Sequence, residues 1–344
     1  MKVTALKLLG ILVLLAAGVV FPHVFTSPLV MTIAIFTLIY ATMAAGWNIL
    51  GGYTGYISLG HAAFFGVGAY SLGLICQHWQ ISGGYGPFYL LPVAGLIAAA
   101  IATPVGWITL RTRRHVFVVL TIAMLFIGQL LATNLENVTG GSQGLGFPTP
   151  PWLGADFNPP FYYAALITLV CTTAVSWWIR QSKFGLGLLA IRDDEDRAMG
   201  LGVPTGPSKL IVFVIAAFFI GIAGAIYGYF VTFLYPSFAF NPLDDLAMVL
   251  MTFTGGLGTL AGPIMGAFLI EPLHEYFTFE YGASGLYLIL YGALFLVVIL
   301  LMPLGIIPTL TGLRSKWTPS WRKRPEVAPT PREEPGIERE VASR

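Results

Sequence analysis

The sequence has little charge, and its basic residues are very unevenly placed. Only 10% of its 344 residues are Asp, Glu, Lys or Arg, against roughly 25% in soluble domains. No Lys or Arg occurs in stretches 8–110, 115–179 and 210–313, so all eighteen fall into short clusters outside them. A soluble protein needs charge over its whole surface, and this distribution excludes that class. Cytoplasmic loops of membrane proteins collect Lys and Arg, so the pattern predicts a polytopic membrane protein and its topology.

Other absences limit the possible functions. Cys76 and Cys171 are the only cysteines and both lie in apolar segments, so neither a disulfide nor a metal site is predicted. No GxxxxGK[ST] phosphate loop occurs, because GVPTGPSK at Gly202–Lys209 has the wrong spacing. No nucleophile–base cluster suggests an enzyme, and a net charge of +2 gives no sign of nucleic-acid binding. We therefore expect no cofactor or metal on this chain, and energy supplied by another chain.

What the sequence does contain is apolar runs, with 56% hydrophobic residues and a mean hydropathy of +0.78. A membrane helix needs about 20 such residues, and an even number of crossings must separate clusters on one side. With the basic clusters cytoplasmic, both termini are cytoplasmic, and the first run is an uncleaved helix rather than a signal peptide. The predicted fold is all-α, with about eight full transmembrane helices over Leu8–Val24, Leu29–Leu50, Leu59–Ile75, Phe88–Leu110, Val116–Asn134, Phe161–Ile179, Leu210–Leu234 and Leu286–Met302.

Two glycine-rich segments interrupt this pattern, GGYTGYISLGH from Gly51 and GGLGTLAGP from Gly255. The second lies in 246–273, which is about 28 residues or roughly 42 Å as helix, too short for two crossings of a ~30 Å core. We expect a re-entrant pair of half-helices there. Broken helices at membrane depth are tolerated only in the protein interior or beside a cavity, and in transporters they flank the substrate path. The predicted break residues are Gly51, Gly52, Gly55, Gly255, Gly256 and Gly258.

Polar residues inside apolar segments are costly and therefore candidates for function. Asn48, Ser58 and His61 surround the first break. They could form hydrogen bonds to backbone groups that the glycines free, or they could line a path for a zwitterionic substrate, and the sequence does not decide between these two roles. No Lys or Arg and no acidic pair is expected at mid-depth, which argues against an ion-coupled carrier. The predicted substrate-path residues are Asn48, Ser58, His61, Gln129, Thr139, Gly140 and Gly141.

Acidic residues occur late in the chain as well. Asp244 and Asp245 precede the second break, where N-capping of their own segment is the simplest role. Glu271 and His274 are three residues apart and are expected to pair with each other.

The longest internal loop, 181–209, predicts one short amphipathic helix over Ala190–Met199 that ends at the glycines from Gly200 onward. Two interpretations stand: a solvated connector, or a coupling helix whose apolar side docks in a groove on a partner. The candidate coupling residues are Ala190, Ile191, Arg192, Glu195, Ala198 and Gly202.

Four ordered motifs make about residues 30–305 similar to a known family. Segments Gly46–Tyr70, Val138–Leu145, Leu188–Val203 and Gly255–Ala267 resemble the signatures of the branched-chain amino acid ABC importer permeases, in their LivM-like branch. The loop departs from the family pattern at Leu186, where a basic residue is usual, and at Asp196–Arg197, which replace small apolar residues.

The resemblance implies a permease subunit of a bacterial inner-membrane importer, with the ABC importer permease fold over 1–313 and a disordered cytoplasmic tail over 314–344. Its partners would be a homologous second permease, two ATPase subunits that use the ATP, a periplasmic binding protein and the surrounding lipid. The implied substrates are leucine, isoleucine and valine, with urea or short-chain amides as the alternative.

Overall fold

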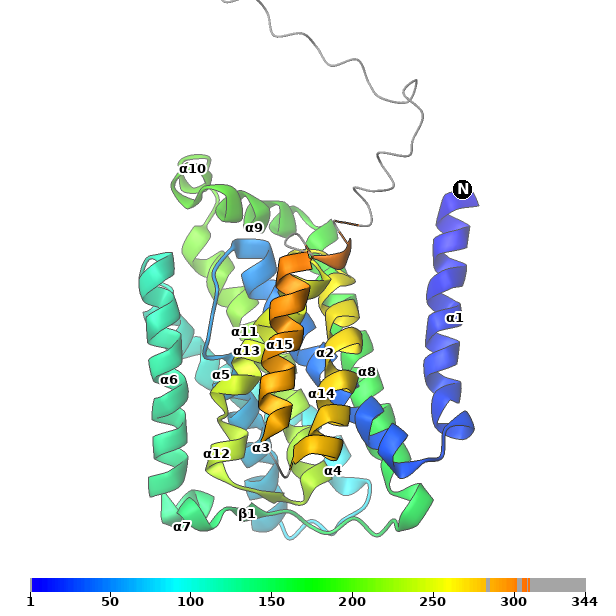
Figure 1. Cartoon of the computed structure of the whole chain (residues 1–344). Helices are drawn as coiled ribbons and strands as arrows, with labels where there is room; N and C mark the ends of the chain where they lie inside the picture. Colours follow the sequence, from blue (N-terminus) through cyan, green and yellow to red (C-terminus); the bar gives the residue numbers. More distant parts are fainter. Residues whose placement is uncertain (1, 283–284, 302–304, 308, 310–344) are drawn as a thin grey trace, which may run out of the picture. The chain divides into compact units, whose positions relative to one another are not determined.

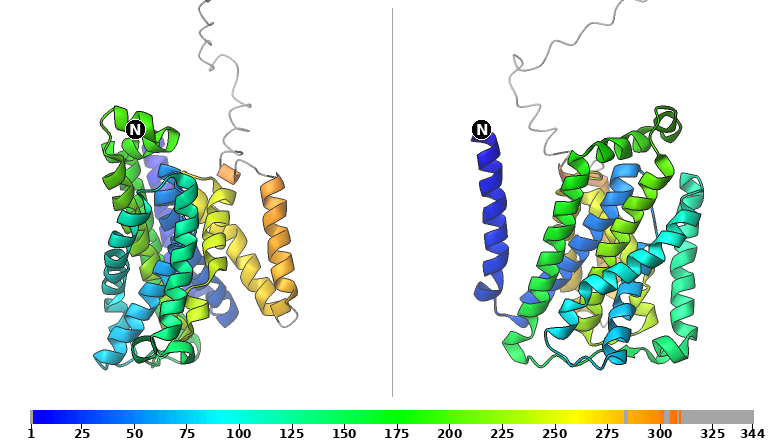
Figure 2. Two further views of the ribbon diagram at one scale, coloured as in Figure 1. Left: turned by 90° about the vertical axis from the view of Figure 1, so that its left-hand side faces the viewer. Right: turned by 180° about the vertical axis from the view of Figure 1, so that it is seen from behind.

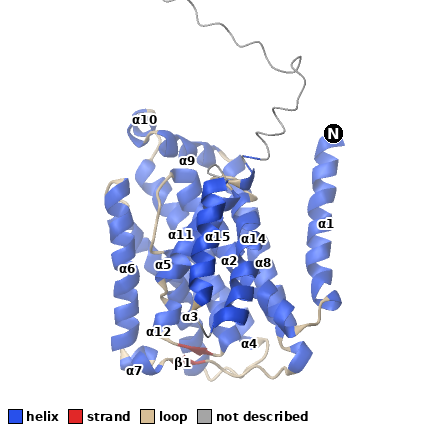
Figure 3. Cartoon of the chain, viewed as in Figure 1, coloured by secondary structure: helices blue, strands red, loops and turns tan. Residues whose placement is uncertain are grey.

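The computed structural model describes residues 2–282, 285–301, 305–307 and 309, and most of them are helical (Figure 1, Figure 3). The predicted tail over 314–344 and residues 310–313 lie outside the described residues. In chain order the elements are α1 (Lys2–Val24), α2 (Pro28–Thr54), α3 (His61–His78), α4 (Gly86–Tyr89), α5 (Leu91–Thr109), α6 (Arg114–Asn134), α7 (Glu136–Thr139), η1 (Gly141–Gln143), β1 (Leu145–Gly146), η2 (Gly154–Asp156), α8 (Asn158–Gln181), α9 (Lys183–Asp193), α10 (Glu195–Gly200), α11 (Thr205–Val231), β2 (Phe233–Leu234), α12 (Pro236–Ala239), α13 (Pro242–Gly255), α14 (Gly262–Tyr281) and α15 (Leu286–Leu301).

A helix occupies each of the eight apolar segments predicted from the sequence, with its ends displaced by a few residues. Five of these helices are both long enough and apolar enough to cross a membrane: α2, α5, α6, α8 and α11. The predicted all-α, polytopic class is therefore confirmed.

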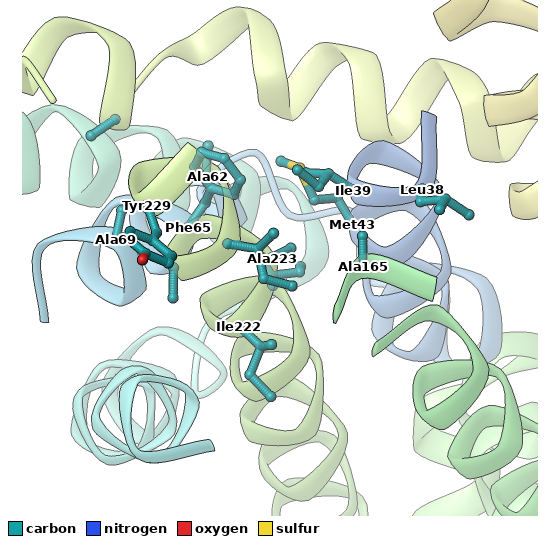
Figure 4. Close-up of a cluster of buried hydrophobic side chains, with 14 of the residues drawn as sticks. Leu38, Ile39, Met43, Ala62, Phe65, Ala69, Ala165, Ile222, Ala223 and Tyr229 are labelled. Carbon is teal, nitrogen blue, oxygen red and sulfur yellow. The ribbon is translucent and has the colours of Figure 1, made fainter. Parts of the chain in front are cut away.

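Helix α11 forms the centre of the bundle and packs against α2, α3 and α5. Small residues allow this close approach, which is how helices associate where apolar surroundings provide no hydrophobic drive. A Cβ atom on Gly68 of α3 would lie 2.0 Å from the carbonyl oxygen of Gly221, and one on Gly224 would lie 2.0 Å from that of Phe65. Figure 4 shows the core beside these contacts, with Leu38, Ile39 and Met43 of α2, Ala62, Phe65 and Ala69 of α3, Ala165 of α8, and Ile222, Ala223 and Tyr229 of α11.

The first glycine break lies between α2 and α3. Helix α2 continues through Gly51 and Gly52, so the prediction that these two glycines interrupt the helix is wrong. The helix ends instead at Gly55, whose left-handed backbone (φ 72°) lets its N–H bond the carbonyl of Gly51. Residues 55–60 then run without helix to α3, and Trp47 fixes them by donating its indole N–H to the Ser58 carbonyl at 2.8 Å.

The second glycine break separates two helices that pack along each other, α13 and α14. Gly255 ends α13, and Gly256 (φ 127°) and Gly258 (φ 75°) lie in the loop, so all three are placed at the break as predicted. The helices extend over 242–281, well beyond 246–273. Helix α14 alone has 20 residues, which is about 30 Å. The prediction that this part of the chain is too short for two crossings therefore does not apply to α13 and α14. The segment before α13 is tied to the loop after α6 by the antiparallel pair β1–β2.

The loop after α8 folds into two short helices, so the prediction of one helix over Ala190–Met199 is wrong. Asp194, in extended conformation, ends α9 and caps α10, because its carboxylate accepts from the Arg197 N–H at 3.1 Å. Helix α10 ends at Gly200 as predicted. Both helices lie across one end of the bundle and α7 lies at the other end (Figure 1), and Figure 2 shows the bundle from two further sides.

The close packing of α11 gives a prediction for a matched pair of glycines. Gly224→Ala places a methyl group against the backbone of Phe65, and we expect it to lower stability by about 1–3 kcal/mol, the usual cost of overpacking. Gly206→Ala, on the same helix with no atom within 4 Å, should leave stability unchanged or slightly raise it. The measurement is the thermal unfolding midpoint of the purified chain in detergent; equal midpoints for the two variants would contradict the packing argument.

Candidate functional site

The two glycine breaks meet, and Asn48 joins them. Its side chain, 1% exposed, accepts a hydrogen bond from the Gly258 N–H at 2.9 Å and donates one to the Thr259 carbonyl at 3.0 Å. A Cβ atom on Gly52 would collide with the Asn48 amide and approach the Gly258 nitrogen. The last turn of α2 therefore lies directly on the loop between α13 and α14, and Asn48 bonds backbone groups freed by the glycines.

His61 and Ser58, the other residues predicted around the first break, are also buried at 0% exposure. The His61 ring packs edge-on against Phe64 and Phe213, with ring centroids 5.8 and 5.1 Å away. Within the described structure neither of its ring nitrogens has a hydrogen-bond partner. Burial of both side chains means that any contact with a solute requires this region to open.

Asp245 reaches across to the first turn of α3. Its carboxylate, 1% exposed, accepts from the Ala62 N–H at 3.1 Å, where a negative charge is favoured by the helix dipole. The expectation that Asp245 caps its own segment is therefore wrong, because Asn241 caps α13 by accepting from the Leu243 N–H. Asp245 thus ties the start of α13 to the start of α3, near the first break.

Arg192 of α9 contacts both breaks. Its Nη1 donates to the Gly52 carbonyl at 2.8 Å, and a Cβ atom on Gly258 would lie 2.3 Å from the same nitrogen. Arg114 at the start of α6 holds the end of α9 in place by donating to the carbonyls of Ile191 and Arg192, at 2.8 and 2.9 Å. A movement of α9 would therefore be felt at Gly52 and Gly258 directly.

Glu195 of α10 makes a second link, to the segment that forms the first break. It pairs with Lys209 Nζ at 2.5 Å and accepts from the Tyr56 hydroxyl. Burial raises the pKa of Glu195, but the hydrogen bonds from Lys209 and Tyr56 outweigh it, so the pKa falls below its usual value. Glu195 is consequently ionised at neutral pH, as the buried Lys209 ammonium requires.

Most of the predicted coupling residues face inward. Ile191 and Ala198 are 0% and 2% exposed, and Arg192 and Glu195 make the internal bonds described above. The apolar side chains that face outward from this loop are Leu186, Met199 and Leu201, at 65%, 55% and 84% exposure. Neither Met199 nor Leu201 is among the predicted coupling residues, because the prediction places Met199 at the end of one helix and Leu201 in the glycine-rich segment beyond it. Gly202, which follows Leu201, has free space around it, because no atom would lie within 4 Å of a Cβ atom on this residue. Ala190 is half-buried.

The remaining predicted residues lie at the other end of the bundle or along α6. Thr139 of α7 donates its hydroxyl to the carbonyls of Ala132 and Leu135 and so closes the end of α6. Gly140 and Gly141 follow with positive φ (75° and 58°), which forms the tight turn. Gln129 is half-buried within α6. These residues are not brought together with the meeting point of the two breaks.

The Asn48 bridge gives a prediction with a matched control. Asn48→Ala leaves the buried Gly258 N–H and Thr259 carbonyl without partners, so we expect a loss of about 1–3 kcal/mol per group and faster amide exchange over 256–261. Asn134→Ala removes an exposed amide that bonds only the Leu130 carbonyl of its own helix and should change neither. Hydrogen–deuterium exchange with thermal melting measures both effects; unchanged exchange at 256–261 would show that Asn48 does not hold the breaks together.

Comparison with known proteins adds a separate line of evidence. The family model described as branched-chain amino acid transport system / permease component matches residues 29–299. The high-affinity branched-chain amino acid transport system permease protein LivM of Escherichia coli (strain K12) is 27% identical over 89% of this chain and 76% of the relative. LivM of Salmonella typhimurium is 26% identical over the same shares. The LivH permease protein of Salmonella typhimurium is 25% identical over 78% of this chain and 91% of the relative.

No solved structure matches the chain. The family match covers the bundle from α2 to α15, including both breaks and the loop with α9 and α10. Since that match extends over much more than half of its length, the chain belongs to the branched-chain amino acid transport system permease family.

Proposed function

We propose that the chain is the membrane permease subunit of an ATP-binding-cassette importer that carries leucine, isoleucine and valine into a bacterial cell. The family match and the LivM and LivH relatives support the transport role and the substrates. The single observation that carries the mechanism is the contact of Arg192 with both glycine breaks. This role is non-enzymatic, since ATP is hydrolysed by other chains and this one binds no cofactor for transport.

The partners follow from the division of labour. Escherichia coli (strain K12) has both a LivM and a LivH among the relatives, which supports a second, homologous permease beside this chain. Two ATPase subunits would bind at the end that carries α9 and α10, and a periplasmic binding protein at the end that carries α7. Leu201, Met199 and Leu186 form the outward apolar surface of the loop and fit the apolar anchor that docking in a groove requires.

The topology that we propose has ten crossings rather than about eight with a re-entrant segment: α1, α2, α3, α5, α6, α8, α11, α13, α14 and α15. Four crossings precede Arg111, two precede Arg180 and four follow Lys209, so every basic cluster stays on one side. Both the N-terminus and the tail are then cytoplasmic in the inner membrane. Helices α3 and α13 are shorter than full spans. The non-helical segment 55–60 and the segment 232–241, which contains β2 and the short helix α12, complete their crossings.

In the proposed mechanism, closure of the ATPases moves α9 and α10, and this movement reaches the breaks through two links. Arg192 pulls on the Gly52 carbonyl and on the loop at Gly258, while Glu195 pulls on Tyr56 through its hydrogen bond. Loops with glycines can change conformation at low cost, so the breaks are the place where the bundle opens. His61, Ser58 and Asn48 are buried there and would become accessible to the substrate in the open state.

The test of this proposal is uptake into vesicles that hold the complete complex, with ATP inside and the cognate binding protein outside. We expect labelled leucine to accumulate only when both are present, and labelled urea not to accumulate. Uptake of urea alone would transfer the chain to amide import, and leucine uptake without ATP would contradict an ATP-driven importer.

The outward surface of the loop gives a prediction about coupling. Leu201→Asp puts a charge into the proposed ATPase contact, and we expect leucine uptake to fall at least about tenfold, equivalent to 1.4 kcal/mol of docking energy. Leu201 is 84% exposed, so the fold should be unaffected. Leu153→Asp, at an equally exposed leucine (85%) in the loop after β1, is the control for docking and should co-purify with the ATPases as the unmodified chain does.

Assembly of the complex, judged by co-purification of the ATPases, separates failed docking from failed insertion. Normal uptake and assembly in Leu201→Asp would show that the ATPases bind elsewhere. Glu195→Arg is a poorer test, because it leaves Lys209 buried without its partner and should destabilise the chain by about 3–5 kcal/mol.

A further inference from the structure

The expectation that the apolar segments hold no acidic pair is wrong, because a cluster of buried acidic side chains lies on the side of the bundle formed by α2, α13 and α14. Glu271 of α14 is 0% exposed and Asp244 of α13 is 8% exposed. Glu275 and His274 lie on the same turn as Glu271, and the His274 ring packs against Tyr291 with the ring centroids 4.3 Å apart and the planes tilted by 39°. The sequence from 210 to 313 holds no Lys or Arg that could neutralise these carboxylates.

The Glu271 carboxylate differs from the other buried acids in how it is satisfied. Asp244 accepts from the Tyr40 hydroxyl at 2.8 Å, and Asp245 accepts from the Ala62 N–H. Neither oxygen of Glu271 receives a hydrogen bond within the described structure. The predicted pair with His274 is confirmed, with the His274 Nδ1 3.5 Å from Oε1. A buried ionised carboxylate is strongly unfavourable without a positive charge beside it, and the His274 ring carries one only when protonated. This site therefore calls for a cation or for protons.

The spacing on α14 brings three potential ligands together. Glu271, His274 and Glu275 are at i, i+3 and i+4, which places them on one face of the helix. One ligand atom from each lies within 4.8 Å of the other two, and this is the one such group in the part of the chain that the structure describes. Carboxylate and imidazole ligands bind zinc at about 2.0–2.2 Å, so one ion can contact all three after small side-chain rotations.

We propose that Glu271, His274 and Glu275 bind one divalent transition-metal ion, of the Zn²⁺ or Mn²⁺ type. Two carboxylates and a neutral imidazole balance the charge of a divalent ion, whereas a monovalent cation would leave a net negative charge in an apolar environment. Imidazole is a ligand for transition metals and is not typical of Mg²⁺ or Ca²⁺ sites. Glu271 is fully buried at the base of the site, and His274 and Glu275 are both partly exposed.

The site goes beyond the transport role, and its test uses metal binding alone. The full chain, purified in detergent with an affinity tag that contains no histidine and stripped with a chelator, is titrated with Zn²⁺ and with Mn²⁺ by calorimetry. We expect about one equivalent per chain, without competition from excess Mg²⁺. Glu275→Gln should weaken binding at least about tenfold, since even second-shell changes at metal sites cost 10–100-fold. Glu280→Gln, an exposed acid on the same helix, should bind as the unmodified chain does.

Binding of Co²⁺ gives a second measurement, which uses the unmodified chain and a different variant in case Glu275→Gln does not fold. Its visible ligand-field absorption in the unmodified chain should change in His274→Gln, which keeps a polar side chain but removes the imidazole. Absence of stoichiometric binding, or binding that is equal in Glu275→Gln and Glu280→Gln, would overturn the proposal. Because no uptake is measured, this outcome is independent of whether the chain transports leucine.

Discussion

A chain that interrupts its helices inside an apolar environment must supply hydrogen bonds for the backbone groups that it frees. The interior of this protein is arranged around that constraint. Asn48 satisfies groups at Gly258 and Thr259, Asp245 satisfies the first turn of α3, and Arg192 satisfies the Gly52 carbonyl. Each of these bonds joins elements that are distant in the sequence, so the breaks stabilise each other and neither would persist alone.

In the proposed mechanism, the same bonds let a loop outside the bundle act on its interior. Arg192 and Glu195 belong to α9 and α10, yet their partners lie at or beside the breaks. Since interior packing is close around Gly68 and Gly224, the central helices cannot easily shift. The proposed mechanism therefore assigns the movement to the glycine loops, which the loop helices hold by polar contacts.

The sequence predicted the positions of the helices well because hydropathy and length are local properties. It was less reliable where a residue's role depends on its partner. Gly51 and Gly52 look like breakers in a string of glycines, but the helix continues through them because Gly55 supplies the left-handed turn. Asp245 looks like a cap for its own segment, but it caps α3, and nothing local in the sequence indicates that contact.

The uneven distribution of Lys and Arg, the apolar runs and the ordered motifs determined by themselves that this is a polytopic permease of its family. Those features depend on transfer from water to lipid and on composition, which the sequence carries directly. Only the tertiary structure decided which loop residues face inward, that Met199 and Leu201 face outward, and that Glu271 and Glu275 share a turn with His274 beside Asp244. Burial and pairing of polar groups arise from contacts between helices far apart in the chain, and single-sequence periodicity contains no information on those contacts.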